Sequence, residues 1–262
     1  MFIAENHPLD GKGVVSTIEE QEPKNAAQAS VPTKIVENNP TFFFHMITDT
    51  GLFVNQDGTA TVRRMLLTAK SCGISRVIVY SNDSNIPTTY AGVTVIRGTI
   101  INKKQHDRQF LAAIRKSPLN YVIMVSAGEN SFNRAAISTK GVHLLTGITD
   151  LPKRGFDHIL AKMAAEHHTG IVIDLSRIIN PKSRIQALSR YAEILFLQRK
   201  YHFPLTIASG ASTIFGIKNT TEILALCSLF GMTRTESYAA LTGMDAILYP
   251  QQKVRVVDKE VE

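Results

Sequence analysis

The sequence predicts an α/β protein, a TIM-barrel-like parallel β/α barrel with seven or eight strand–helix units. Stretches with strand and helix patterns alternate through residues 41–250, as they do in proteins with a parallel sheet. Most predicted strands are nearly continuous apolar runs, which indicates burial on both faces. Seven or eight units in this length fit a closed barrel near the low end of the usual size. An open doubly wound sheet is the alternative, and the lack of a G-x-G-x-x-G turn after the first strand weakens its dinucleotide-binding version.

The predicted strands are short apolar runs rich in Val, Ile and Leu. They cover residues 42–48, 75–81, 92–101, 120–127, 142–148, 170–176 and 204–210. The stretches between them have a helical period. These predicted helices cover residues 58–73, 107–118, 133–141, 156–168 and 183–201.

Residues that commonly end helices follow two of the predicted helices. Gly73 ends the first helix in the usual C-terminal position, and Pro118 stops the second. In the helix at 156–168, Phe156, Ile159, Leu160 and Met163 share one face.

After the last strand, two capping boxes predict two further helices. Asn219 with Glu222 and Thr233 with Glu236 have the required spacing. Residues 245–250 allow either a short helix or a final strand.

Polar segments flank the predicted barrel domain of residues 41–250. Residues 1–40 have no apolar period and predict a disordered acidic leader, and residues 251–262 predict a polar C-terminal tail. No stretch approaches the roughly 18 apolar residues of a membrane span, and the start lacks a signal-peptide pattern. Cys72 and Cys227 lack metal-ligand spacing. We expect a cytoplasmic protein with reduced cysteines and no membrane association.

The charge is concentrated in the predicted barrel. The whole chain has a formal net charge of +7, but residues 1–40 carry three basic and six acidic groups. The tail carries three of each, which leaves 23 basic and 13 acidic residues in the barrel domain. A basic body indicates a polyanionic partner such as a nucleic acid, with an ordinary solvated surface as the alternative.

Strand ends are where a barrel carries chemistry, and no catalytic set is evident there. His45 and Asp49 stand near the first predicted strand end, without the further His and carboxylate ligands that a metal centre needs. The later strands offer no inward lysine for a Schiff base. We therefore predict neither catalytic residues nor a metal site in this chain.

The stretch Ser209-Gly210-Ala211-Ser212 leaves three possibilities open. A serine nucleophile lacks both the G-x-S-x-G pattern and a base. A phosphate cradle formed by Gly210 and the hydroxyls of Ser209 and Ser212 is more plausible. An ordinary exit from a strand would have the same sequence.

Basic and polar residues on successive connections predict a cationic rim. Arg97 is expected to end a strand, and Asn133 and Arg134 to open a short helix. The other members lie in loops or near a helix start. They are Lys103, Lys104, Lys153, Arg154 and His158. Such side chains suit phosphate oxygens, although each one singly is also compatible with a solvated surface.

Three segments together resemble one protein family. They are "FNRAAIS" (132–138), "LPKRGFDHILAKMAAEHHTGIVIDLS" (151–176), and "FPLTIASGAS" (203–212) with the following "EILALCSLFGM". The sequence is similar to the thirty-kilodalton protein subunit of ribonuclease P, which in archaea is protein component 3. The resemblance covers roughly residues 42–248.

The resemblance implies a function and partners. The implied fold is a PHP-like barrel, related to metallohydrolases but without their metal ligands. The implied role is that of an RNA-binding subunit of ribonuclease P, the endoribonuclease that removes the 5′ leader from precursor tRNA, with the RNA as catalyst. The implied partners are ribonuclease P RNA, a small ferredoxin-like α/β subunit in a heterotetramer, other ribonuclease P proteins and, indirectly, precursor tRNA. Mg²⁺ is expected at the RNA, with no cofactor in this chain.

The resemblance assigns RNA-facing or site-shaping roles to Asn133, Arg134, Lys153, Arg154 and His158. Two other functions stay open on the residues alone. One is a free-standing barrel phosphohydrolase that acts on a phosphorylated small molecule through Ser209–Ser212. The other is a protein-interaction scaffold without RNA contact.

Overall fold

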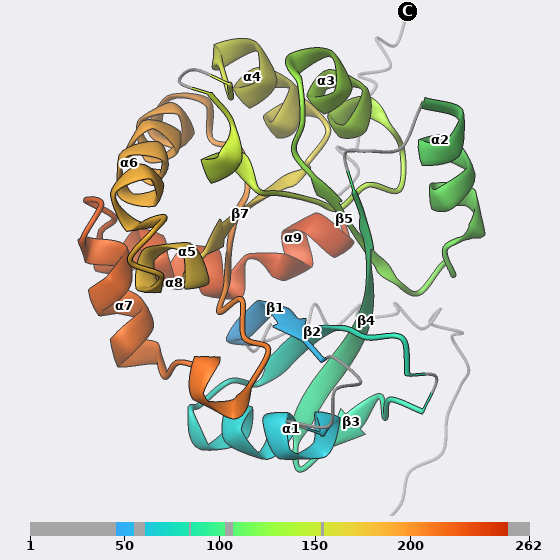
Figure 1. The fold of residues 1–262 in the computed structure, drawn as a ribbon, viewed down its shortest axis with the longest axis vertical. Helices are drawn as coiled ribbons and strands as arrows, with labels where there is room; N and C mark the ends of the chain where they lie inside the picture. Colours follow the sequence, from blue (N-terminus) through green and yellow to red (C-terminus); the bar gives the residue numbers. More distant parts are fainter. Residues whose placement is uncertain (1–45, 55–60, 84, 103–106, 153–154, 251–262) are drawn as a thin grey trace, which may run out of the picture. The chain divides into compact units, whose positions relative to one another are not determined.

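The computed structural model describes residues 46–54, 61–83, 85–102, 107–152 and 155–250. The chain divides into two compact units, Met1–Phe42 and Phe43–Glu262, and all described residues lie in the second. Within that unit the predicted β/α barrel is confirmed, with parallel strands in a ring and helices around it (Figure 1). The predicted leader and tail lie outside the described residues.

The parallel strands follow one another round the ring in chain order. They are β1 (Thr48–Phe53), β2 (Arg76–Tyr80), β4 (Val93–Ile101), β5 (Val122–Ser126), β6 (Leu144–Thr146), β7 (Gly170–Asp174) and β8 (Leu205–Ala208). The ring closes between β1 and β8 without a regular ladder among the described residues. The Phe53 N–H donates to the carbonyl of Ala211 (2.8 Å), and the Thr50 hydroxyl donates to the carbonyl of Ile207 (2.9 Å).

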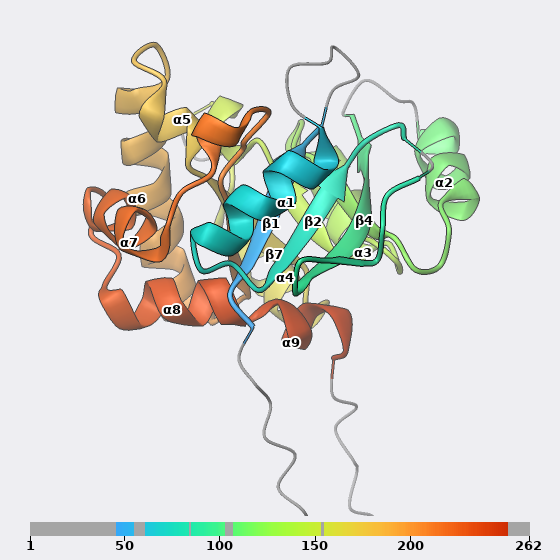
Figure 2. The same cartoon turned by 90° about the horizontal axis from the view of Figure 1, so that it is seen from below.

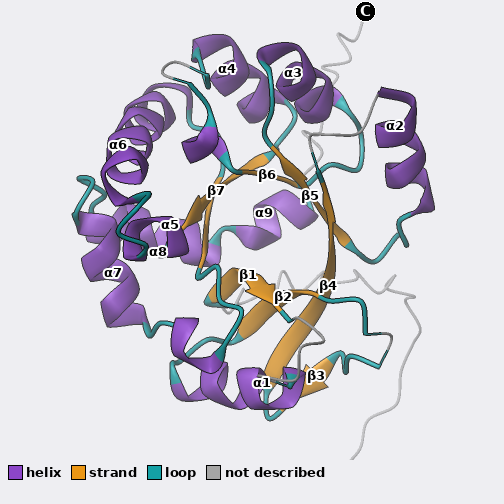
Figure 3. Ribbon diagram, in the orientation of Figure 1, coloured by secondary structure: helices purple, strands orange, loops and turns teal. Residues whose placement is uncertain are grey.

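Most helices lie outside the ring of strands, whereas α9 is seen within it in the same view (Figure 3). The helices are α1 (Val62–Ser71), α2 (Asp107–Lys116), α3 (Asn130–Ser138), α4 (His158–Glu166), α5 (Ser176–Ile179), α6 (Arg184–Tyr201), α7 (Thr220–Ser228), α8 (Arg234–Thr242) and α9 (Met244–Leu248). Two apolar clusters join strands to helices: one includes the faces of α3, α4 and α6, and the other includes α1.

Helix α9 closes the amino end of the barrel. Met244 and Ile247 pack against inward-facing strand residues, among them Ile78 and Leu144. Gly170 makes room for this contact, since a Cβ there would lie 2.5 Å from the Ile247 side chain. Figure 2 shows α9 at one end of the barrel, with α5 at the opposite end. The barrel interior is therefore more accessible from the carboxyl ends of the strands than from their amino ends.

Several boundaries differ from the sequence prediction. The first strand is β1, not residues 42–48, of which 42–45 lie outside the described residues. Helix α3 begins at Asn130, so Asn133 and Arg134 lie inside it rather than opening it. Between β2 and β4 the described chain has no helix but a two-residue strand, β3 (Thr89–Tyr90), antiparallel to β4. Residues 245–248 form part of a helix, which settles the alternative left open for that segment.

Both predicted capping boxes are confirmed. In α8 the Glu236 N–H donates to Thr233 Oγ1 (3.2 Å), and the Thr233 N–H donates to Glu236 Oε2 (2.8 Å). The same reciprocal pair joins Asn219 and Glu222 at α7. Glu236 has an additional partner, because the Arg199 guanidinium reaches both of its carboxylate oxygens, at 2.7 and 3.0 Å.

We expect Glu236→Gln to reduce the acid sensitivity of the fold. The hydrogen bonds from Arg199 and then those from Thr233 lower the pKa of Glu236 to about 2. A depressed carboxyl pKa contributes stability above the unfolded value of 4.5, and this contribution is lost as the pH falls toward 2. Glutamine keeps the capping position but carries no charge. The thermal midpoint of the variant should therefore be lower than that of wild type at pH 7, and the two midpoints should converge as the pH falls to 2. Glu222→Gln is the control, and an equal response of both variants would contradict the prediction.

Candidate functional site at the barrel mouth

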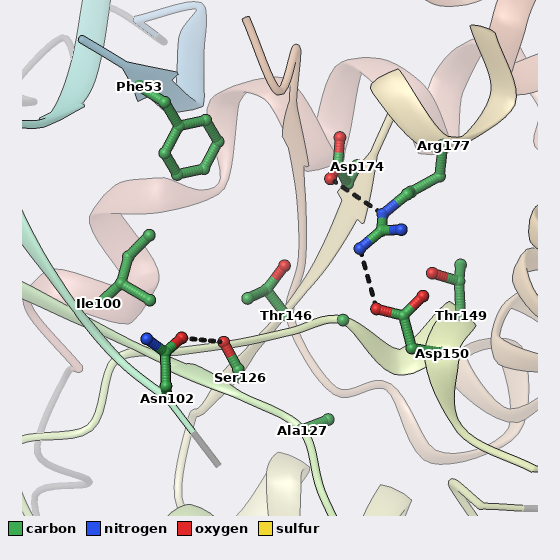
Figure 4. Close-up of a pocket in the computed structure, with 11 residues that line it drawn as sticks. Phe53, Ile100, Asn102, Ser126, Ala127, Thr146, Thr149, Asp150, Asp174 and Arg177 are labelled. Atoms are coloured by element: carbon green, nitrogen blue, oxygen red, sulfur yellow. Dashed lines mark hydrogen bonds and ion pairs between the residues drawn. The ribbon is translucent and has the colours of Figure 1, made fainter. Parts of the chain in front are cut away.

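The carboxyl ends of the strands surround a cavity of about 450 Å³, which we call the barrel mouth. Its lining comes from β1, from β4 to β7 and from the segments that follow them (Figure 4). The residues are Phe53, Ile100, Asn102, Ser126, Ala127, Thr146, Gly147, Thr149, Asp150, Asp174 and Arg177. Short polar side chains dominate one side, where the Ser126 hydroxyl lies 3.4 Å from Asn102 Oδ1. The mouth thus combines polar and apolar side chains at the end of the barrel where binding sites commonly lie.

An arginine between two carboxylates forms the charged part of the mouth. The Arg177 guanidinium lies 2.8 Å from Asp150 Oδ2 and 3.8 Å from Asp174 Oδ2 (Figure 4). Asp174 also accepts hydrogen bonds from the N–H and hydroxyl of Ser176. Burial raises the pKa of Asp174 despite these bonds and the nearby Arg177. Two carboxylates against one guanidinium leave the centre of the mouth without the excess positive charge that would attract a phosphate.

Asp49 lies inside the barrel and organises the β1–β8 closure. Its Oδ1 accepts from the N–H groups of Gly51 (3.0 Å) and Ser209 (2.9 Å), while Oδ2 has no hydrogen-bond partner among the described residues. The side chain is buried, and this burial raises its pKa, opposed mainly by the bonds from Ser209. The Tyr80 hydroxyl is a second buried group without a partner in the described part of the chain. Asp49 is therefore a buried structural carboxyl within β1, not a residue at the strand end as expected.

The structure argues against a phosphate cradle at Ser209–Ser212. The Ser209 N–H is taken by Asp49, and the Ala211 N–H donates to the Ser209 hydroxyl at 3.2 Å. Gly210 has φ +65°, and a Cβ there would lie 2.3 Å from Asp174 Oδ1, so the glycine serves close packing. The N–H groups of Ser209 and Ala211 are thus used within the protein. The prediction of an RNA-binding side chain at Ser209 is corrected too, because that residue is 3% exposed.

Ser212 is exposed and lines a second depression beside the mouth. This depression, the mouth groove, has a volume of about 640 Å³ and shares Phe53, Asp174 and Arg177 with the mouth. The rest of its lining comes from α5, the turn after it, and the connection from β8 to α7. These residues are Ser176, Ile179, Asn180, Pro181, Ser209, Gly210, Ala211, Ser212, Thr213, Phe215, Gly216 and Lys218.

Two of the predicted RNA contacts have hydrogen-bond partners within the barrel, and contact of the half-buried Arg97 with RNA stays a prediction. Arg97 lies in the middle of β4, not at a strand end, and donates to the Tyr121 hydroxyl and the Ile86 carbonyl, both at 3.0 Å. Asn133 is fully buried, and its amide exchanges hydrogen bonds with the N–H (2.8 Å) and carbonyl (2.9 Å) of Gly128. Asn133 therefore shapes the turn between β5 and α3 and offers no surface to an RNA.

The remaining predicted contacts are exposed or lie outside the described residues. Arg134 is exposed on α3, and His158 is exposed at the start of α4, where Asp157 caps the helix. Lys103, Lys104, Lys153 and Arg154 lie outside the described residues. Arg134 and His158 stand on different helices outside the ring (Figure 1). Binding of these residues to RNA stays a prediction.

Sequence reasoning missed the two features that define this end of the barrel. Asp174 could be expected at this edge, because it lies at the end of β7. The first missed feature is the bond between Arg177 and Asp150, which joins two segments that are 27 residues apart. The exposed Phe215 lies in a three-residue 3-10 helix, Ile214–Gly216, which is too short for a periodic signal.

The described residues hold neither a metal centre nor a membrane-spanning helix. They contain no group of three or more His, Cys, Asp or Glu side chains placed to hold a metal ion. In the same part of the chain, no helix has the length and apolar character needed to cross a bilayer.

Comparison with solved structures places the barrel among known folds. A chain in the structure of archaeal ribonuclease P with mature tRNA matches with a TM-score of 0.59 and 19% identity, over 82% of this chain and 100% of that one. Histidinol phosphate phosphatase from Lactococcus lactis matches with a TM-score of 0.51 and 8% identity, over 71% and 92% of the two chains. At these identities the likeness shows a shared fold.

Sequence relatives are more specific. Ribonuclease P protein component 3 of Methanococcoides burtonii is 36% identical over 123 residues, which are 46% of this chain and 51% of the relative. The same component of Methanothermobacter thermautotrophicus is 33% identical over 157 residues, 58% and 63% of the two chains. The matched part thus spans between half and two thirds of these relatives. The family model described as RNase P subunit p30 matches residues 45–255, which include the whole described barrel. The chain is a member of the RNase P subunit p30 family.

Proposed function

We propose that this chain is a protein subunit of ribonuclease P that binds the catalytic RNA and supports removal of the 5′ leader from precursor tRNA. The observation that carries the proposal is the family match across residues 45–255, which covers every strand and helix of the described barrel. In this role the chain is one part of an endoribonuclease, and the RNA performs the cleavage.

Charge supports binding of RNA on the outside of the barrel. The barrel domain carries 23 basic and 13 acidic residues, whereas the mouth centre holds two carboxylates against one guanidinium. Phosphate contacts should therefore form on exposed cations such as Arg134 rather than at the centre of the mouth. The occupied N–H groups of Ser209 and Ala211 also weigh against the phosphohydrolase alternative.

The partners belong to the same proposal. We infer that the chain assembles with ribonuclease P RNA, a small ferredoxin-like α/β subunit and other ribonuclease P proteins. The match to a chain in a ribonuclease P assembly is consistent with this inference at the level of the fold. We also expect Mg²⁺ at the RNA and a cytoplasmic location for the complex.

We expect Arg134→Ala to weaken binding of transcribed ribonuclease P RNA and to reduce its salt dependence. If Arg134 neutralises one phosphate, its removal should lower the steepness of log affinity against log salt by roughly 0.7 to 0.9. The slope should be measured by filter binding across several salt concentrations. Arg234→Ala, at the start of α8, is a control with the same change in charge. Equal slopes for Arg134→Ala and wild type would show that α3 does not bind the RNA through this residue.

Purification of the native complex tests the proposal as a whole. A structured RNA and small protein subunits should copurify with the chain, and ribonuclease treatment should abolish cleavage of precursor tRNA. Full cleavage activity after the RNA has been destroyed would contradict the proposal and favour a protein enzyme.

A further inference from the structure

We propose that the mouth groove binds one unstacked nucleotide of the RNA, with its base on Phe215. The inference rests on the proposed function and adds to it a specific subsite. The groove lies beside the mouth, between α5 and the connection from β8 to α7, and its volume of about 640 Å³ is in the usual range for a small-ligand site.

Phe215 provides a platform for stacking. Its side chain is 84% exposed, although it is apolar and has no polar group that water could hydrate. Packing underneath supports the position of its backbone: a Cβ on Gly216 would lie 2.8 Å from the Ala211 side chain, so only glycine permits this approach. The aromatic ring is therefore presented to solvent from a short segment that packs closely on the chain beneath it.

Apolar residues of another element line the same groove. Ile179 at the end of α5 is 40% exposed, and Pro181 follows it in the turn to α6. The Arg184 guanidinium donates to the carbonyls of Ile178 and Ile179, both at 2.9 Å, and so secures the end of α5. A flat apolar ligand could thus lie against Phe215 together with the apolar side chains of α5 and its turn.

Polar and charged groups of the lining suit the rest of a nucleotide. The Lys218 ammonium donates to the carbonyl of Phe215 at 2.8 Å, which holds a cation beside the platform. At the side shared with the mouth, the paired Arg177 and Asp174 supply a hydrogen-bond donor and an acceptor. Base edges carry both donors and acceptors, which suit Arg177 and Asp174, and a phosphate suits the Lys218 ammonium. Proteins recognise RNA largely through splayed, unpaired bases that stack on aromatic side chains.

This combination favours a nucleotide over a protein segment. A purely apolar partner would leave the Lys218 ammonium facing an uncharged surface, whereas RNA matches both the aromatic ring and this cation. Paired bases are stacked within a helix and cannot lie on Phe215. The expected occupant is therefore a base in a loop, bulge or end of the RNA.

The test compares RNA binding by three variants of the full chain, with transcribed ribonuclease P RNA as the probe. We expect Phe215→Ala to weaken binding by about tenfold, in line with the loss of one stacked base. Phe215→Tyr should stay within about twofold of wild type, because the ring is kept. Phe196→Ala removes a phenylalanine that is 70% exposed on α6 and should change nothing. The salt slope of Phe215→Ala should equal that of wild type, unlike the slope of Arg134→Ala.

Chemical probing of the RNA bases provides a second readout. One unpaired base should be protected by wild type and by Phe215→Tyr, but not by Phe215→Ala. If wild type binds RNA and Phe215→Ala binds equally well, the nucleotide site is wrong while the proposed function stands. If Phe215→Ala instead loses a copurifying protein subunit with RNA affinity unchanged, the groove is a protein surface and the inference fails. If wild type binds no RNA, the proposed function itself fails.

Discussion

Asp245→Ala should lower the free energy of unfolding by about 3 kcal/mol, since it leaves a buried guanidinium without its counter-ion. Asp245, in the first turn of α9, lies 2.7 Å from Arg76 at the start of β2, whose side chain is only 8% exposed. The pair holds α9 across the amino end of the barrel, where Met244 and Ile247 enter the core. Urea denaturation monitored by circular dichroism would measure the loss of stability.

A matched variant separates the charge from the hydrogen bond. Asp245→Asn keeps an oxygen acceptor for Arg76 and should recover part of the stability. Arg76→Met should be less harmful than Asp245→Ala, because it removes the charge that would otherwise stay buried. If Asp245→Ala unfolded at the same urea concentration as wild type, the ion pair would not be what holds α9 in place.

Asp49→Ala should lower the free energy of unfolding by a similar amount, about 3 kcal/mol. It leaves two buried backbone N–H groups, at the seam where β1 meets β8, without a hydrogen-bond acceptor. Asp49→Asn, in contrast, should raise the free energy of unfolding at neutral pH. Burial raises the pKa of Asp49, so the folded state binds the proton more tightly than the unfolded state does. Stability from this group is therefore present at low pH and is lost as the pH rises from 3.8 toward the raised value.

The asparagine variant carries no charge at any pH and still offers an acceptor to Gly51 and Ser209. It should be more stable than wild type at pH 7, and the difference should shrink as the pH falls toward 4. Urea midpoints across this pH range would test the prediction. A difference that grows on acidification would mean that the carboxylate, not the acid, is the form that the folded barrel prefers.

The architecture was predictable because it depends on local patterns. Apolar runs such as residues 170–174 and the capping boxes at Asn219 and Thr233 are set by neighbouring residues, and the structure places elements where those patterns lie. The first strand was misplaced because residues 42–48 are more apolar than the actual β1, whose Thr48, Asp49 and Thr50 are buried through hydrogen bonds, several of them across the seam.

The site was much less predictable, since it depends on contacts between distant segments. Nothing near Asn133 in the sequence shows that its amide is consumed by Gly128, or that Arg97 donates to the Tyr121 hydroxyl. The pairing of Arg177 with Asp150 and the exposure of Phe215 likewise arise only when the ring closes. Composition correctly identified a basic body, but the side chains that bind could not be read from composition alone.

The position of α9 has a consequence for synthesis of the chain. It is the last helix of the described residues, and it fills the lower interior of a barrel whose first strand is made almost two hundred residues earlier. Until α9 has left the ribosome, the inward faces of Ile78, Val122 and Leu144 lack their cover, and β1 also waits for β8. Exposed apolar surface of this kind promotes aggregation of nascent chains. Early termination near residue 243 should therefore yield a product that chaperones retain, whereas the full chain is released as a closed barrel.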